Sequence, residues 1–505
     1  MSLNYNFIWL LCYLLVLVGL AGYGFHRLSI VYLYWKNRNN KPQPKARFQE
    51  LPVVTVQLPM FNEKFVVDRL LESVAALDYP QDRLEIQILD DSTDETTEQC
   101  YRKVEELKSR GFDAVCIHRT DRTGFKAGAL EAATKVAKGE FLLILDADFV
   151  PEPDLLQKTI HFFTDENVGL VQTRWGHINR EYNLLTRIQG MYLDGHFAME
   201  QTARNRSGRF FTFNGTAGIW RKCVIGDAGG WSHDTLTEDM DLSYRVQLKG
   251  WRFIYLNDVV TPAELPVDMD GFKSQQHRWT KGSIQVCQKI LLDIWRSNAP
   301  LKAKVEATTH LTCNYSYLLL ALLCFLVYPI CTQRIPENET VFMWFVNVAL
   351  FFMTSVAVCI FYMSAQIVVR PKSWWKELPY LPLLLTLSVG MAVNNAKAVL
   401  EAIFGHQSAF VRTPKYGVDR KEDRRHVSQL KRNGYRAIKS VVIPVLEIAC
   451  GTFFLNLIII MIRQGHYLSP ILMIPFLGFY YTGFCSLGRM ISNLLPAKQT
   501  AKAKN

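Results

Sequence analysis

The sequence lacks several patterns that mark common classes of protein. Its eleven cysteines include no Cys-x-x-Cys pair, and six of them lie in apolar runs, so neither a disulfide framework nor a zinc site is indicated. Internal repeats and long low-complexity segments are also missing. Charged residues make up only 20% of the 505 residues and hydrophobic residues 49%, which indicates that part of the chain does not lie in water.

The hydrophobic residues are concentrated in a few runs. Residues 50–305 have the mixed composition of a soluble domain, whereas five apolar runs before and after them carry almost no charge. About 20 residues of helix, at about 1.5 Å each, match the hydrocarbon core of a bilayer, which is about 30 Å thick. Five membrane-spanning helices are therefore predicted, at residues 7–25, 311–331, 341–369, 441–462 and 470–491.

The first run is interpreted as a retained membrane anchor. No basic residue precedes it and no convincing small-residue cleavage site follows it, so it differs from a signal peptide. Six basic residues lie between residues 27 and 47, and the positive-inside rule places this flank in the cytoplasm. We therefore expect a multi-pass protein of the plasma or inner membrane, with its soluble domain in the cytoplasm.

Residues 378–404 form a more ambiguous apolar segment. Its second half contains side chains that are costly in hydrocarbon, namely Asn394, Asn395, Lys397 and Glu401. If the segment crossed the membrane, residues 405–440, with ten basic and three acidic side chains, would face outward against the positive-inside rule. An interfacial or re-entrant element is therefore expected here.

Seven regions follow from these features. The net charge of +11 comes from basic residues beside the apolar runs and in residues 405–440, so a lipid bilayer is the expected partner and nucleic acid is not. The regions are an anchor with a basic linker (1–49), the soluble domain (50–270), interfacial helices (271–306), two spans (307–370), an interfacial or re-entrant element with a loop (371–440), two spans (441–493) and a basic tail (494–505).

The soluble domain has the pattern of an α/β fold with a largely parallel sheet, because short apolar runs alternate with helical periodicity. Strands are predicted at 53–58, 85–89, 114–118, 141–145 and 168–173, and helices at 64–77, 94–109, 126–137 and 154–163. Ligands of such sheets bind beyond the carboxyl ends of the strands. Two of those ends read Asp90-Asp91-Ser92 and Asp146-Ala147-Asp148.

Asp146 and Asp148 are candidate metal ligands. Two carboxylates at alternate positions of a strand end can share a divalent cation with diphosphate oxygens, which suits Mg²⁺ or Mn²⁺. An isolated Asp-x-Asp is a weak signal, because ordinary turns after strands produce most such matches. Its weight depends on three further motifs elsewhere in the chain.

The first two of these motifs have simple alternatives. Lys126-Ala127-Gly128 opens a predicted helix, where backbone N–H groups and an ammonium suit a diphosphate, but it could be a plain helix start with a solvated lysine. Glu238 and Asp239 supply carboxylates late in the domain, or form an exposed acidic turn.

The motif Gln275-Gln276-His277-Arg278-Trp279 is the most specific of the three. Arginine can bind a phosphate through two hydrogen bonds, and tryptophan offers a flat face on which a sugar can stack. The alternative is an amphipathic helix on the membrane with its tryptophan at the interface. No comparably simple alternative explains all four motifs in this order.

These motifs resemble those of the inverting glycosyltransferase family 2 synthases, which include cellulose, chitin and hyaluronan synthases. Those enzymes share two Asp motifs, a T/E-D motif and Q-x-x-R-W in the same order. The longer stretches LPMFNE (58–63), LDDSTD (89–94), DADF (146–149), FNGTAGIWR (213–221) and EDMDL (238–242) are most similar to the mannan-synthase and xyloglucan-backbone glucan-synthase branches of the cellulose-synthase-like proteins. The resemblance is strong over residues 50–300 and weaker in the membrane region.

The resemblance implies a GT-A (Rossmann-like) α/β domain inserted between transmembrane helices. It also implies a processive, metal-dependent enzyme that builds a β-linked polysaccharide at the cytoplasmic face and exports it. The donor would be a nucleotide sugar, with UDP-glucose and GDP-mannose both compatible, and the acceptor the growing polysaccharide. The motifs do not report the shape of the donor pocket, so they do not choose between the two.

The family's site residues are carried over position by position. Asp239 beside Glu238 becomes the general base, Arg278 stabilises the departing diphosphate, and Trp279 forms the floor under the acceptor. Asp146 and Asp148 would hold the metal, and either Asp90 or Asp91 the nucleoside. The implied nucleotide-sugar set is Asp90, Asp91, Lys126, Gly128, Asp146, Gln275, Arg278, Thr413 and Lys415, and the implied acceptor set is Trp279, Asn214, Gly215 and Thr216.

Thr413 and Lys415 belong to the stretch FVRTPK (410–415), which lies where cellulose synthases carry a gating loop. Pro414 departs from the loop of those enzymes, and a basic loop that docks on lipid headgroups is the alternative. Two other functions also stay open. One is a non-processive transferase that glycosylates a lipid and resembles ceramide glucosyltransferase, and the other is a membrane scaffold or transporter with a degenerate transferase domain.

Overall fold

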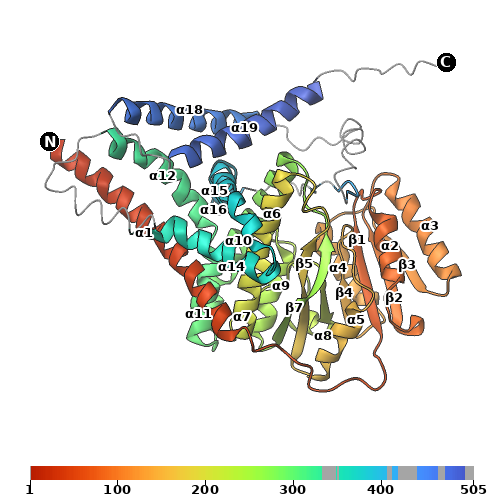
Figure 1. Cartoon of the computed structure of the whole chain (residues 1–505). Helices are drawn as coiled ribbons and strands as arrows, with labels where there is room; N and C mark the ends of the chain where they lie inside the picture. The colour runs from red at the N-terminus through yellow and green to blue at the C-terminus, as the bar shows by residue number, and fades with distance from the viewer. Residues whose placement is uncertain are drawn as a thin grey trace, which may run out of the picture.

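A mixed sheet lies at the centre of the soluble domain (Figure 1). This computed structural model describes residues 2–332, 349, 352–406, 412–413, 415–418, 441–464 and 472–494. Within them, seven strands pair in the order β3-β2-β1-β4-β6-β5-β7, and only β6 runs antiparallel to its neighbours. The strands are β1(Val54–Met60), β2(Leu84–Asp90), β3(Asp113–His118), β4(Phe141–Ile144), β5(Val168–His177), β6(Gly218–Arg221) and β7(Arg252–Ala263).

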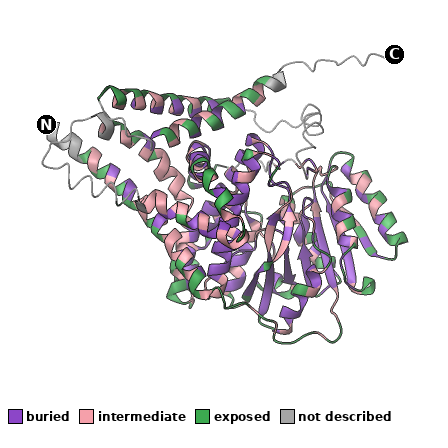
Figure 2. Cartoon of the chain, in the orientation of Figure 1, coloured by how far each residue is buried: buried purple, intermediate pink, exposed green. Residues whose placement is uncertain are grey.

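Helices cover both faces of this sheet. Parallel strands in such a sheet are buried on both sides, and in β1 six of the seven residues are buried. Val56 and Leu70 belong to the core on one face, and Leu142 and Trp220 to the core on the other. Figure 2 shows the strands as mostly buried and the outer surface of α3 as exposed.

The helices of the soluble domain connect and flank the strands. They include a π-helical turn, η3, between α6 and α7. Their bounds are α2(Val67–Ala75), η1(Gln81–Arg83), α3(Thr96–Ser109), α4(Phe125–Val136), α5(Leu155–Thr159), η2(Ile160–Thr164), α6(Leu184–Asp194), η3(Gly195–Gln201), α7(Thr202–Arg206), α8(Lys222–Asp227) and α9(Glu238–Leu248).

A second group of helices lies beside the sheet domain and includes the N-terminal and C-terminal helices (Figure 1). α10 links the two parts, because it packs against α9 of the soluble domain and against α11, α16 and α19. The helices are α1(Ser2–Asn37), α10(Met269–Arg296), α11(Leu301–Thr312), α12(Tyr315–Thr332), η4(Phe352–Val356), α14(Ala357–Val369), η5(Trp374–Tyr380), α15(Leu381–Gly390), α16(Ala392–Ile403), α18(Val442–Arg463) and α19(Met473–Leu494).

Two helices in the described part of the chain are long and apolar enough to cross a membrane, namely Ile8–Asn37 within α1 and Val442–Arg463. The number rises to four if two bent pairs each count as one span. One pair joins α11 to α12 with a bend of 53°, and the other joins Trp374–Gly390 to α16 with a bend of 41°.

The expected count of five spans therefore stays a prediction. Part of the span expected at 341–369 lies outside the described residues, and Met353–Val369 is a shorter apolar helix. The span expected at 470–491 overlaps α19, which is not one of these two long apolar helices. The bend after Gly390 fits either a broken span or the re-entrant element expected at 378–404.

The five strands expected from the sequence are confirmed within a few residues of their bounds. β6 and β7 are missed for physical reasons. β6 is only four residues long, and β7 contains Asn257, Asp258 and Pro262, so neither shows an uninterrupted apolar run. The antiparallel β6 also makes the sheet mixed rather than wholly parallel.

A buried ion pair joins α10 to the hairpin of α18 and α19. The ammonium of Lys273 lies 2.5 Å from the carboxylate of Glu447 and also donates to the Thr482 carbonyl (3.1 Å) and the Ser486 hydroxyl (2.9 Å). Lys273 is 2% exposed and Glu447 is fully buried. Removing one partner would leave an unpaired charge in a site that water does not reach.

We predict that Glu447→Gln destabilises the protein by about 3–5 kcal/mol, because the Lys273 ammonium stays buried without its counter-charge. The double variant Lys273→Met/Glu447→Met removes both charges at similar volume and should unfold close to the wild-type temperature. Thermal unfolding in detergent measures both effects. Equal unfolding temperatures for Glu447→Gln and wild type would contradict the assigned role of the pair.

Candidate active site

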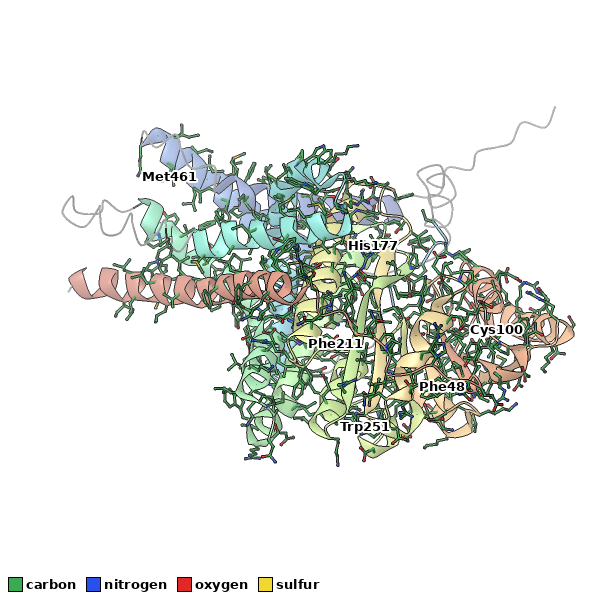
Figure 3. The ribbon with its side chains drawn as sticks, turned by 60° about the horizontal axis from the view of Figure 1, so that its bottom comes forward. Phe48, Cys100, His177, Phe211, Trp251 and Met461 are labelled. Atoms are coloured by element: carbon green, nitrogen blue, oxygen red, sulfur yellow. The ribbon has the colours of Figure 1, made fainter. Side chains whose placement is uncertain are left out.

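A cavity of about 200 Å³ opens at the carboxyl edge of the sheet. The ends of β1, β2, β4, β5 and β7 contribute to it, together with the starts of α4 and α9, the N-terminal half of α10, and Arg412, Thr413 and Lys415. His177, labelled in Figure 3, marks this edge at the end of β5. The candidate residues that line the cavity are Asp91, Lys126, Asp146, Asp148, Asn214, Gly215, Glu238, Asp239, Gln275, Arg278, Trp279, Thr413 and Lys415.

Three candidates, Asp90, Gly128 and Thr216, do not line this cavity. The Asp90 carboxylate is fully buried, accepts a hydrogen bond from the Thr97 hydroxyl (2.7 Å) and lies 2.7 Å from His118 Nδ1. Of the two aspartates proposed for the nucleoside, only Asp91 therefore faces the cavity. Asp90 instead supports the turn that follows β2, where its Oδ1 accepts from the Ser92 N–H at 3.1 Å.

Gly128 shapes the start of α4 instead of facing a ligand. A Cβ at this position would lie 2.1 Å from the Thr123 carbonyl oxygen, so only glycine fits. Its N–H donates to the carbonyl of Gly124 at 3.0 Å. This N–H is therefore already used within the chain, and the diphosphate contact expected for it has no free donor. Lys126, two residues earlier, does reach the cavity.

Lys126 is the cation of the cavity that lies beside Asp146. Its ammonium donates to Asp146 Oδ1 at 2.5 Å and to the Gly215 carbonyl at 2.8 Å. Burial opposes the charge of this ammonium, but the carboxylates of Asp146, Glu238 and Asp239 together outweigh burial and raise the pKa of Lys126 above its usual value. Behind the pair, the backbone N–H of Asp146 donates to the buried Thr216 hydroxyl (2.8 Å). Thr216 thus fixes the backbone that follows β4, and its buried hydroxyl does not face the cavity in which an acceptor sugar would bind.

Asp148 is paired with a residue from a distant segment. The Lys415 ammonium lies 2.6 Å from Asp148 Oδ2 and donates to the Glu264 carbonyl at 2.9 Å. The Glu264 carboxylate accepts three successive backbone N–H groups, from residues 416–418, at 2.9, 3.0 and 3.2 Å. Burial raises the pKa of Glu264, while the Lys415 ammonium opposes the rise. Glu264 therefore holds the segment 415–418 across the edge of the cavity.

Arg412 and Thr413 belong to the same region of the chain. The Arg412 guanidinium lies 3.0 Å from the Glu63 carboxylate and donates to the Phe61 carbonyl at 2.9 Å. Burial raises the pKa of Glu63 to about 8, although the Arg412 charge acts in the opposite direction. The Thr413 hydroxyl is buried and has no hydrogen-bond partner among the residues that the structure describes. A donor of this kind at the cavity wall suits a phosphate oxygen.

Asp239 lies in the first turn of α9 and faces the cavity. Its Oδ1 accepts a hydrogen bond from the Met240 N–H at 2.8 Å. Burial and the neighbouring Glu238 carboxylate raise the pKa of Asp239 to about 7. A carboxylate with this pKa can accept a proton near neutral pH, which is the requirement for a general base.

Aromatic side chains form one wall of the cavity. Trp279 of α10 packs with the cluster that contains Leu193, Phe197 and Leu265. Trp175, at the end of β5, stacks on Phe197 with ring centroids 4.6 Å apart. Flat indole surfaces of this kind are suited to the face of a sugar ring. Arg278 and Gln275 lie on α10 beside Trp279 and line the same cavity.

Glu63, Glu264 and Trp175 also line the cavity, although none of them was among the predicted site residues. Glu63 and Trp175 follow predicted strands by only a few residues, so the rule that ligands bind beyond strand ends could have found them. Glu264 directly follows β7, a strand that the sequence does not reveal. No comparable signal pointed to it.

The residues present fit a divalent cation that is shared with a diphosphate. Among the described residues, no group of three or more His, Cys, Asp and Glu side chains could hold a metal ion by itself. Asp146 and Asp148 supply hard carboxylate oxygens, the donors that Mg²⁺ and Mn²⁺ prefer when phosphate oxygens complete the coordination shell. Both carboxylates already face cations, Lys126 and Lys415, at 2.5 and 2.6 Å.

Comparison with known structures bears on the fold. The chain is similar to the mannosyltransferase PcManGT from Pyrobaculum calidifontis in complex with GDP-Man and Mn²⁺, with a TM-score of 0.55 and 19% identity. The match covers 78% of this chain and 100% of that one. At this identity the likeness supports a GT-A-like α/β fold with a mixed sheet and carries no further argument.

Comparison with sequences finds relatives of about half of the chain. Glucomannan 4-beta-mannosyltransferase 2 of Arabidopsis thaliana is 42% identical over 286 residues, which are 54% of this chain and 53% of that protein. Glucomannan 4-beta-mannosyltransferase 1 of Oryza sativa subsp. japonica is 41% identical over 277 residues, with the same coverage. The chain thus spans about half the length of the curated relatives it matches. Residues 52–282 match the family model described as "Glycosyltransferase like family 2", so this chain carries a glycosyltransferase family 2 domain.

Proposed function

We propose that this chain is an inverting mannosyltransferase that extends a β-linked mannan or glucomannan from GDP-mannose at the cytoplasmic face of a membrane. The observation that carries the proposal is the cavity in which Asp239, Arg278 and Trp279 meet the strand end of Asp146 and Asp148. The names of the relatives, both glucomannan mannosyltransferases, favour mannose over glucose as the donated sugar.

The proposed reaction is a single in-line displacement. The acceptor hydroxyl oxygen attacks the anomeric carbon of the donor, the bond from that carbon to the phosphate oxygen breaks, and the nucleoside diphosphate leaves from the opposite face. Asp239 takes the proton of the attacking hydroxyl. An α-linked donor therefore gives a β-linked product, and no covalent intermediate with the protein is needed.

The cations of the cavity would act on the leaving diphosphate. Arg278 can bind it through two hydrogen bonds, and Lys126 lies beside Asp146 on the same side of the cavity as Gly215. Mg²⁺ or Mn²⁺, held by Asp146 and Asp148 together with the diphosphate, would neutralise the charge that develops as the bond breaks. Trp279 and Trp175 would orient the acceptor sugar.

Arg412, Thr413 and residues 415–418 would close over the bound nucleotide. Thr413 offers an unpaired hydroxyl among the described residues, and Lys415 already lies at the metal-binding carboxylate Asp148. On this proposal both donors move to the diphosphate when a donor sugar binds, and closure excludes water from the reacting carbon. The rest of the loop, residues 419–440, lies outside the described residues.

Incubation of the purified protein in detergent with labelled GDP-mannose, UDP-glucose and related donors, plus Mn²⁺ or Mg²⁺, tests the proposal. We expect a ladder or long polymer of β-linked mannose from GDP-mannose, established by mass spectrometry and linkage analysis, and no product in excess EDTA. A single sugar attached to a lipid would contradict polymer synthesis. Turnover that persists in EDTA would exclude the role given to Asp146 and Asp148.

Replacing Asp239 by asparagine should lower kcat by about 10²-fold or more while nucleotide binding stays measurable, because the variant keeps the side-chain shape and loses the base. Asp234→Asn is the matched control, since Asp234 is exposed, pairs with Lys289 at 2.8 Å and does not line the cavity. Steady-state kinetics and nucleotide titration distinguish the two variants. Undiminished kcat in Asp239→Asn would defeat the assignment of the base.

The pKa of Asp239, raised to about 7, predicts the pH dependence of kcat. Only the deprotonated carboxylate accepts a proton, so kcat should be constant above about pH 8 and fall about tenfold per unit below about pH 6. A carboxylate with an ordinary pKa near 4 would keep kcat constant down to about pH 5. A profile of the second kind would show that the environment of Asp239 does not raise its pKa.

A further inference from the structure

Asn214 lines the cavity, but its side-chain amide forms hydrogen bonds with residues that do not line it. Its Oδ1 accepts a hydrogen bond from Gln201 Nε2 at 2.6 Å, and its Nδ2 lies 2.9 Å from His196 Nε2. Both partners belong to the π-helical turn η3, in which an extra residue per turn changes the direction of the side chains. The amide is therefore fixed at both ends by one helix.

These contacts determine the protonation of His196. Because the Asn214 oxygen already accepts from Gln201, the nitrogen of the amide must face the imidazole and donate to it. His196 Nε2 must then be the acceptor, so the proton of the neutral ring is on Nδ1. That nitrogen lies 3.1 Å from Glu200 Oε2, to which it donates. Burial and the charges of Arg204 and Arg27 lower the pKa of His196 to about 3, in agreement with a neutral ring.

The carboxylate of Glu200 is anchored in turn by two arginines. Arg204 of α7 lies 3.2 Å from Glu200 and 2.9 Å from Glu306 of α11, and Arg27 of α1 forms an ion pair with Glu200. His26 of α1 lies 3.0 Å from the same Glu306. The imidazole thus rests on a buried network that joins α1, α7 and α11, and its position is fixed from outside the cavity.

The residue after Asn214 touches the proposed base. Gly215 has a φ of +79°, and a Cβ on it would lie 3.1 Å from Asp239 Oδ2 and 3.5 Å from the Lys126 nitrogen. Its carbonyl accepts from Lys126 at 2.8 Å. The turn at 214–215 therefore lies beside both the carboxylate that would take the proton and the ammonium near the diphosphate site. A rotation of the Asn214 amide would move this turn.

We propose that His196 is a positioning residue for glycosyl transfer. By accepting a hydrogen bond from Asn214 it holds the turn at Asn214 and Gly215 in the place that sets the distance between Asp239 and Lys126. This inference rests on the proposed function, because it assumes that Asp239 is the base. It also changes the role expected for Asn214, whose side chain supports the turn and does not bind the acceptor.

His196→Leu and His196→Gln test the hydrogen bond. Leucine removes the acceptor, so kcat should fall about tenfold or more while KM for GDP-mannose stays close to wild type. Glutamine can place its Oε1 near the position of Nε2 and should restore most of kcat. His161→Leu is the matched control, because His161 is a buried histidine that accepts from the Phe48 N–H (3.2 Å) outside the cavity.

A compensating pair keeps the test independent of folding defects. Asn214→Asp turns the donor into an acceptor that faces the lone pair of His196, so kcat should fall by a similar factor at pH 8. His196→Gln/Asn214→Asp should recover activity, since the glutamine amide can turn its NH₂ group toward the carboxylate.

Wild-type kcat for Asn214→Asp or His196→Leu, or a double variant no better than Asn214→Asp alone, would overturn the inference. Equal losses in His196→Leu and His196→Gln would overturn it as well. The wild-type reaction in the same assay tests the proposed function separately. If the wild-type protein makes no product from any nucleotide sugar, the proposed function fails, whatever the variants do.

Discussion

Pairing of opposite charges at the carboxyl edge of the sheet is the interaction on which the cavity depends. Asp146 and Asp148 both follow β4, and their two negative charges lie on the same short segment of chain. Lys126 and Lys415 neutralise them at 2.5 and 2.6 Å, and each lysine thereby ties another segment to the strand end. A nucleotide sugar with its cation would enter a site whose charges are already balanced, and would exchange partners with the lysines.

Burial of the strands on both faces of the sheet explains why much of the fold could be predicted. Strands β1 and β2 are covered on both faces and are rich in apolar residues, although each also buries polar side chains, and acidic residues lie at the end of β2 or within three residues after β1. β6 and β7 could not be found this way, because a short antiparallel strand and a strand interrupted by polar residues depend on their neighbours for pairing. Hydropathy could not give the number of membrane crossings either, because bends divide two of the apolar segments.

At the site, the sequence predicted residue types better than the direction of each side chain. It placed Asp239, Arg278 and Trp279 in one ligand site, and the three do line one cavity. It could not distinguish Asp90 from its neighbour, or foresee that Thr216 bonds to the backbone of Asp146, because those contacts depend on how distant segments pack. Glu264 belongs to no recognised motif, and its importance becomes clear only from the three backbone N–H groups that donate hydrogen bonds to it.

Helix α10 connects the apolar helices mechanically to the cavity. Lys273 is fixed in the apolar hairpin of α18 and α19, and Trp279 of the cavity follows it by six residues, a rise of about 9 Å along the helix. A helix is stiff over so short a distance. If α18 and α19 lie in a bilayer, a change in its thickness or lateral pressure that tilts these helices would reach Trp279, and the surrounding lipid would then influence the shape of the cavity.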